Sequence, residues 1–155
     1  MDGEGTILSV HSYPRYVDEE AFLDVAEELS EEFPIYGVKS SGSSSELVGD
    51  FYEDSFEDIN NGRNGYISPK HLESLESPFY VVGGLVSECI PGAAESVLRS
   101  GEDAYIVEEG AFEKVGDGFF TYEDMSSSDQ DFSDIFRNLN ELGVPSVNSY
   151  DFFRN

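Results

Sequence analysis

Apolar residues recur at helical spacing in several stretches of the chain, most clearly over residues 18–33. The apolar stripe of this stretch consists of Phe22, Val25, Ala26, Leu29 and Phe33. Asp18 is suited to cap the start of a helix, and Pro34 is suited to end it. The pattern therefore predicts an amphipathic helix over residues 18–33.

The same reading assigns most of the remaining chain to helices and strands. Further helices are expected over residues 46–59, 68–77, 85–99 and 128–142, and the helix over 85–99 is expected to be interrupted at Pro91 and Gly92. Strands are expected over residues 6–12, 35–39, 79–82, 104–107 and 119–122, with a further strand over 111–115 and an edge strand over 147–152. Gly83 and Gly84 indicate a turn or a close backbone contact.

This order of elements predicts an α+β fold. We expect a single compact domain over residues 1–155, with a mixed or antiparallel sheet and amphipathic acidic helices packed against it. The hydrophobic fraction of 39% is large enough for a packed core. The expected core residues are Phe22, Leu29, Phe51, Phe79, Val81, Phe132, Phe136 and Leu139.

The net charge restricts the possible functions of the protein more than any sequence motif does. The formal net charge is −25, from 33 acidic and 8 basic residues. Such a surface repels phosphate, which excludes nucleic acid and anionic membrane as direct partners. Like charges also stand four residues apart in the first acidic helix, as at Glu20 and Asp24 or Glu27 and Glu31, and each such pair destabilises a helix by roughly 0.2–0.5 kcal/mol.

Candidate catalytic residues are few. Cys89 is the single cysteine, and its acidic neighbour Glu88 would raise a thiol pKa, so we interpret it as a small core residue. His11 and His71 are not at zinc-ligand spacing and are interpreted as surface or capping residues. No catalytic motif stands out, so the sequence predicts a protein that is not an enzyme and has no catalytic, metal-binding or cofactor-binding residue.

Two segments bear a faint resemblance in spacing to calcium loops. They are Asn60–His71 and Glu113–Asp124, with glycine at the sixth position of each. Calcium requires oxygen ligands at positions one, three and five and a bidentate Glu at position twelve. Gly62 and Val115 supply no side-chain oxygen at position three, so we expect no bound cofactor, although a degenerate calcium protein stays open as a minor alternative.

Two explanations of the charge remain open. In the first, the protein is a nucleic-acid mimic that inhibits a DNA- or RNA-handling enzyme by occupying its basic groove, as anti-restriction, anti-CRISPR and nuclease-immunity proteins do. The helix from Asp18 to Glu32 would carry about one carboxylate per 3 Å, close to the spacing of phosphates along a DNA strand. In the second, the protein is salt-adapted, because high salt would screen the repulsion.

The mimicry hypothesis assigns partner binding to carboxylates of two acidic helices and names a basic nucleic-acid-binding protein or nuclease complex as the partner. These residues are Asp18, Glu19, Glu20, Asp24, Glu27, Glu28, Glu31, Glu32, Glu46, Asp50, Glu53, Asp54, Glu57 and Asp58. The chain shows no basic leader and no apolar run of about 20 residues, so we expect no membrane partner and a cytoplasmic location.

Overall fold

The structure is a computed structural model that describes residues 4–59 and 63–149. Its strands are β1 (Thr6–Val10), β2 (Ile35–Lys39), β3 (Asp54–Glu57), β4 (Phe79–Gly84), β5 (Ala104–Val115), β6 (Gly118–Thr121) and β7 (Ser146–Val147). Its helices are α1 (Glu19–Glu32), α2 (Pro69–Glu73), α3 (Cys89–Arg99), α4 (Tyr122–Ser126) and α5 (Ser133–Leu142).

The strands form one sheet in the order β3-β2-β1-β4-β5-β6, with β7 also paired to β5. Every pairing is parallel except that of β5 with β6, which is antiparallel. The expected α+β fold with a mixed or antiparallel sheet is therefore confirmed only in part, because one pairing is antiparallel but the sheet is mostly parallel. The protein has an α/β architecture in which helices flank a mostly parallel sheet.

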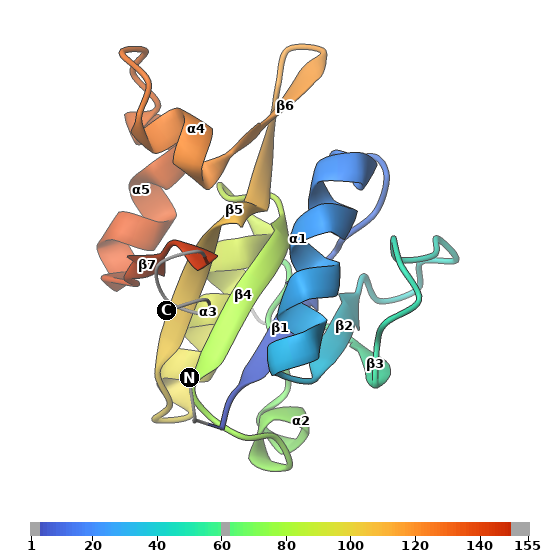
Figure 1. Ribbon diagram of the computed structural model, residues 1–155. Coiled ribbons are helices and arrows are strands. Elements are labelled where there is room, and N and C mark those ends of the chain that lie inside the picture. Colours follow the sequence, from blue (N-terminus) through green and yellow to red (C-terminus); the bar gives the residue numbers. More distant parts are fainter. Residues whose placement is uncertain (1–3, 60–62, 150–155) are drawn as a thin grey trace.

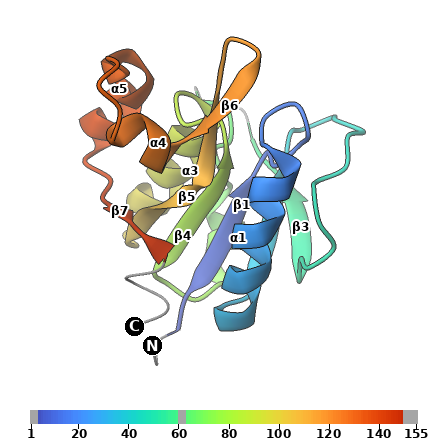
Figure 2. The ribbon, with the colours of Figure 1, turned by 45° about the horizontal axis from the view of Figure 1, so that its top comes forward.

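Helices cover both faces of this sheet, with α1 in front and α3 behind it in Figure 1 and in the turned view of Figure 2. The α1 residues Phe22, Ala26 and Leu29 belong to one apolar core, whereas α3 and α5 contribute to the other. The central strand β4 serves both cores by alternation, because Phe79 and Val81 face one and the next residues along the strand face the other. A strand buried on both faces has to be continuously apolar, which explains the sequence of β4.

Several predicted elements are confirmed. The first helix begins after Asp18, whose side chain accepts a hydrogen bond from the Ala21 amide, and the strands over 35–39 and 79–82 are present as β2 and within β4. Of the expected core, Phe22, Leu29, Phe79, Val81, Phe132 and Leu139 are buried, whereas Phe51 and Phe136 are only partly buried. No helix within residues 4–59 and 63–149 is long and apolar enough to cross a membrane.

The helix expected over residues 46–59 does not form. Gly49 adopts φ +99°, which an α-helix cannot contain, and residues 54–57 instead extend the sheet as β3 beside β2. The apolar positions that suggested helical spacing serve other contacts: Val48 and Phe51 pack with the core under α1, and Phe56 packs on the other face. Tertiary pairing at the sheet edge therefore overrides the local pattern.

Other boundaries also differ from expectation. Residues 104–107 and 111–115 form one long strand, β5, and the helix expected over 128–142 is reduced to α5, which ends at Gly143 in the left-handed conformation. Helix α3 continues through Pro91 because this residue lies in its first turn, where a missing N–H does no harm. Part of the expected edge strand over 147–152 lies outside the described residues; Val147 belongs to β7.

The strand order places a change of direction between β1 and β4. From β1 the chain proceeds outward through β2 to β3, whereas from β4 it proceeds to β5 on the other side. In parallel sheets this arrangement leaves a crevice beyond the carboxyl ends of the strands, and ligands bind there. Residues that directly follow β1, β2, β3 and β4 therefore meet at the carboxyl end of the sheet, at the top of the view in Figure 1.

Candidate functional site

A pocket of about 530 Å³ opens at the carboxyl end of the sheet. Its wall includes His11 after β1, Ser40 after β2, Asp58 after β3 and Cys89 at the start of α3. The remaining lining residues are Tyr16, Ser41, Ile59, Asn64 and Glu88. A thiol, an imidazole and a carboxylate from segments far apart in sequence thus share one pocket.

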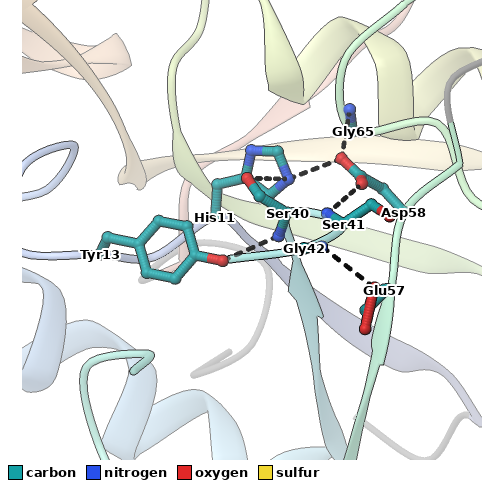
Figure 3. Close-up of polar contacts among 8 residues, drawn as sticks. All are labelled: His11, Tyr13, Ser40, Ser41, Gly42, Glu57, Asp58 and Gly65. Atoms are coloured by element: carbon teal, nitrogen blue, oxygen red, sulfur yellow. Dashed lines mark hydrogen bonds and ion pairs between the residues drawn. The ribbon is translucent and has the colours of Figure 1, made fainter. Parts of the chain in front are cut away.

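The imidazole of His11 is bound to the carboxylate of Asp58, with 2.8 Å between Nε2 and Oδ2 (Figure 3). The Ser40 hydroxyl lies 3.3 Å from the same ring nitrogen. An ionised carboxylate can only accept hydrogen bonds, so Nε2 carries the proton that it donates to Asp58. The lone pair of the neutral ring is then on Nδ1, which leaves that nitrogen available to accept a proton.

His11 is held in an unusual backbone conformation and is buried. Its φ of +45° is the one positive value found among the described non-glycine residues, and its relative exposure is 3%. Strain of this kind persists where the surrounding structure fixes a side chain, and it is concentrated at functional sites. Burial lowers the pKa of His11 below its usual 6.5, despite the opposing effect of Asp58, so the ring is neutral at pH 7.

Asp58 is fixed by three contacts visible in Figure 3. Besides His11, its carboxylate accepts hydrogen bonds from the backbone amide of Ser41 at 2.9 Å and from that of Gly65 at 3.0 Å. These donors come from the loop after β2 and from the segment before α2. The carboxylate therefore links three segments and sets the orientation of the imidazole.

Cys89 is the first residue of α3 and is 5% exposed. Burial, with smaller contributions from the carboxylates Glu88, Asp58 and Glu113, raises the pKa of its thiol to about 11. The positive end of the helix dipole acts in the opposite direction on a sulfur at this position. The resting state of the pocket at neutral pH is consequently a protonated thiol and a neutral imidazole, and not a thiolate and an imidazolium.

Two glycines allow the segment before α2 to lie directly against the start of α3. A Cβ on Gly65 would lie 2.3 Å from the carbonyl oxygen of Cys89, and a Cβ on Gly92 would lie 1.9 Å from that of Asn64. Neither distance is possible between real atoms. The absence of side chains at these positions thus brings the Asp58 partner Gly65 and the Cys89 backbone together.

The turn that precedes Cys89 is anchored from the other side by Glu113 on β5. This side chain accepts hydrogen bonds from the amide of Ser87 at 3.0 Å and from its hydroxyl at 3.1 Å, and the residue is 7% exposed. Burial raises the pKa of Glu113, although the two bonds from Ser87 lower it in part. Asn138 on α5 donates to the Ser87 carbonyl at 2.8 Å, so the turn before Cys89 is held on both sides.

The carboxylates that sequence reasoning assigned to partner binding lie in three places. Residues Asp18, Glu19, Glu20, Asp24, Glu27, Glu28, Glu31 and Glu32 are exposed at the start or along the outer surface of α1. Residues Glu46, Asp50 and Glu53 lie in the irregular segment before β3, and Asp54 and Glu57 lie on β3. Two acidic helices side by side do not exist, and Asp58 belongs to the pocket instead.

The histidine and cysteine interpretations also need correction. His11 was expected at the surface or in a cap, yet it is buried and bound to Asp58. Cys89 is small and buried as expected, but it lines a pocket. His71 is half-buried and stacks on Phe56 with ring centroids 4.4 Å apart. A signal for the first two was present, since each closely follows an apolar strand, but the parallel pairing that unites them was not predicted.

The calcium hypothesis does not fit the second segment with loop-like spacing. Residues 113–121 run through β5 and β6, so they form a hairpin and not a helix–loop–helix unit. The first segment includes residues 60–62, which lie outside the described residues. Within the described chain, no group of three or more His, Cys, Asp and Glu side chains is placed to hold a metal ion.

Comparison with known proteins gives a match at the level of structure alone. No family model matches the sequence, and no curated protein matches it. An isochorismatase-like hydrolase from Alkaliphilus metalliredigens has a TM-score of 0.65 at 12% identity, with 98% of both chains covered. The pyrazinamidase of Pyrococcus horikoshii, solved in complex with zinc, has a TM-score of 0.64 at 13% identity, with 94% and 99% covered. PnC1 from L. infantum, solved in complex with nicotinate, has a TM-score of 0.65 at 12% identity, with 94% and 93% covered.

The chain has an isochorismatase-like fold. This finding overturns the interpretation as an inhibitory nucleic-acid mimic that is not an enzyme and binds a nuclease complex, because the fold is shared over nearly its whole length with hydrolases. The zinc in the Pyrococcus structure is a property of that protein, and the described donors of this chain do not match a metal site. Salt adaptation, the second explanation of the charge, is a separate property that the fold does not test.

Proposed function

We propose that the protein is a hydrolase that cleaves an amide or ester bond in a small molecule, with Cys89 as the nucleophile. The observation that carries this proposal is that Cys89 lines the same pocket as the hydrogen-bonded pair of His11 and Asp58. Activated nucleophiles have this arrangement: a nucleophile, a base, and a third group that orients the base. The hydrolases that share the fold support the same reaction class.

Each group has a defined role in the first half of the reaction. The Cys89 sulfur forms a bond to the carbonyl carbon while its proton passes to Nδ1 of His11, and Asp58 stabilises the resulting imidazolium through Nε2. Breakdown of the tetrahedral intermediate expels the amine or alcohol, which takes the proton from His11. The product of this half-reaction is a thioester on Cys89.

Water completes the cycle. His11 takes a proton from a water molecule as its oxygen attacks the thioester carbonyl, and the sulfur leaves and is reprotonated by the imidazolium. The carboxylic acid product then dissociates. Because burial keeps the thiol neutral at rest, His11 has to take the thiol proton for the sulfur to attack.

The experiment is a hydrolysis assay on a panel of small amides and esters that includes nicotinamide and pyrazinamide. We expect release of carboxylate from at least one member, with loss of activity in Cys89→Ala and His11→Ala. Glu141→Gln on the exposed face of α5 is the control variant, because it removes a charge outside the pocket and should keep full activity. Activity that survives Cys89→Ala would show that another group is the nucleophile.

Coverage supports the further proposal that residues 1–155 form one domain of this type, because 98% of the chain aligns with 98% of the Alkaliphilus protein. A cytoplasmic location stays a prediction from the sequence.

A further inference from the structure

The pocket that contains Cys89 has a strongly one-sided charge. Of its described lining residues, Asp58 and Glu88 are acidic and none is Lys or Arg. His11 is neutral at pH 7, because its pKa is lowered by burial, and Cys89 is a protonated thiol. Residues 60–62, which follow the lining residue Ile59 in sequence, are Asn, Asn and Gly and add no charge.

The two acidic residues are not equivalent. Asp58 already accepts hydrogen bonds from His11 and from two backbone amides, so its charge is largely directed into the protein. Glu88 is exposed at the pocket wall and stands immediately before the nucleophile. Its charge is therefore the one that a ligand entering the pocket meets.

Three basic residues adjoin lining residues of the pocket in sequence, Arg15, Lys39 and Arg63, and none of them is itself a lining residue. Arg63 is paired with Glu95 on α3 at 3.1 Å. Arg15 donates to the Ser45 hydroxyl at 2.9 Å and lies over the ring of Tyr13 at 4.5 Å. Arg63 is therefore neutralised by Glu95, whereas the charge of Arg15 reaches the pocket at His11, where it is the smallest of the effects on the pKa.

We propose that the pocket selects its substrate by charge: it accepts a small carbonyl compound that carries a positive charge, and Glu88 attracts that charge while carboxylates are rejected. The inference rests on the proposed function of the Cys89 site. Two like charges within one pocket, inside a protein of net charge −25, create a potential that concentrates cations and repels anions. Glu88 is thus a specificity-determining residue.

The test uses Cys89 as its own probe, since it is the single cysteine of the chain. Three methanethiosulfonate reagents of similar reactivity are compared, with a cationic aminoethyl group, an anionic sulfonatoethyl group and a neutral methyl group. Each transfers its thioalkyl sulfur to the cysteine sulfur, so that a disulfide forms and methanesulfinate leaves. Labelling rates are measured by mass spectrometry and divided by the rates with free 2-mercaptoethanol.

The expected result is that the cationic reagent labels Cys89 at least about tenfold faster than the anionic one after this correction. Glu88→Gln should reduce the ratio about threefold or more. The control Glu141→Gln removes the same net charge at a distance from the pocket and should leave the ratio unchanged. Melting curves of both variants verify that they are folded.

The other outcomes separate the two proposals. If Cys89 is labelled equally fast by both charged reagents, or faster by the anionic one, charge selection is wrong and the proposed hydrolase function stands. If Glu88→Gln and Glu141→Gln lower the ratio equally, Glu88 does not determine specificity. If none of the reagents labels Cys89, the thiol does not open to the pocket, which overturns the proposed function and the charge selection with it.

Discussion

The Nε2 atom of His11 and the Oδ2 atom of Asp58 lie 2.8 Å apart, although 47 positions separate them in the chain. Their meeting is a consequence of strand order. His11 directly follows β1, Asp58 directly follows β3, and both strands run parallel to β2, which lies between them. The two side chains therefore lie together at the carboxyl end of the sheet. Their contact fixes which imidazole nitrogen can accept a proton.

Asp58→Asn tests the function of this contact. An amide at this position can donate a hydrogen bond to Nε2, which moves the ring proton to Nδ1 and removes the base. We expect hydrolysis to slow by about 10²-fold or more. The melting temperature should also fall, because the amide nitrogen cannot accept the backbone hydrogen bond that a carboxylate oxygen accepts from Ser41 or Gly65. Full activity in the folded variant would show that the tautomer of His11 is not set by Asp58.

The pH dependence of hydrolysis should reflect the neutral form of His11. Activity requires an unprotonated ring, so it is lost as the pH falls through the pKa of His11, which burial places below 6.5. Steady-state rates from pH 4 to pH 8 measure this acid limb. A half-maximal point above pH 6.5 would contradict the burial of the base.

Alkylation of Cys89 by iodoacetamide provides a readout independent of substrate. Because the thiolate is the reactive form and burial raises the thiol pKa to about 11, the rate should keep rising up to about pH 11. Glu113→Gln removes a carboxylate that raises this pKa, and it should move the curve to lower pH while Glu141→Gln does not. A plateau near the ordinary thiol pKa of about 8.5 in the parent protein would show that Cys89 is not desolvated.

The packing of α3 against the loop around Asn64 predicts that Gly92→Ala destabilises the fold, although Gly→Ala in a helix usually stabilises it. In an exposed helix interior this change stabilises by about 1 kcal/mol, but here the new Cβ would lie 1.9 Å from the Asn64 carbonyl oxygen. We expect a loss of about 1–3 kcal/mol in the free energy of unfolding, together with loss of activity. Gly118→Ala is the matched control, since no atom lies within 4 Å of its added Cβ. Equal stability of the two variants in urea unfolding would refute the close approach.

The acidic surface of α1 makes a prediction about salt. Glu31 lies in the last turn of α1, which contains no basic residue, and it stands four residues after Glu27. Glu31→Lys replaces a repulsive pair with an attractive one and favours the helix dipole, so it should stabilise the fold by about 1 kcal/mol at low salt. Melting curves should show a rise of about 2–4 °C that shrinks in 1 M NaCl. An identical rise at both salt concentrations would indicate a cause other than charge.

Sequence patterns predicted the elements in which local signals and tertiary packing agree. The first acidic helix has a capping Asp18, a regular apolar stripe and a terminating proline, and it forms as α1. The apolar residues 79–82 form the centre of the sheet within β4. The segment 46–59 failed because its apolar spacing fits two structures, and the choice between them depends on whether β2 has a partner at the sheet edge.

The candidate site could not be predicted for a related reason. No short motif unites His11, Asp58 and Cys89, and their relation depends on parallel pairing of strands that are distant in sequence. Without that pairing, one cysteine beside acidic residues indicates an unreactive thiol, and an aspartate among 33 acidic residues carries no information. The large negative charge suggested binding through an acidic surface. The isochorismatase-like fold, shared with hydrolases, instead directs attention to the pocket at the carboxyl end of the sheet.

The most direct test of the proposed hydrolase function is the detection of a covalent acyl intermediate on Cys89. The protein is mixed with 4-nitrophenyl acetate, release of nitrophenolate is followed by absorbance, and the quenched protein is digested and analysed by mass spectrometry. The proposed function predicts a burst of nitrophenolate stoichiometric with protein and an acetyl group on the peptide that contains Cys89. It also predicts that the adduct is absent in Cys89→Ala and strongly slowed in His11→Ala. Nitrophenolate release at the same rate in parent and Cys89→Ala proteins, or an acetyl group located elsewhere, would contradict it.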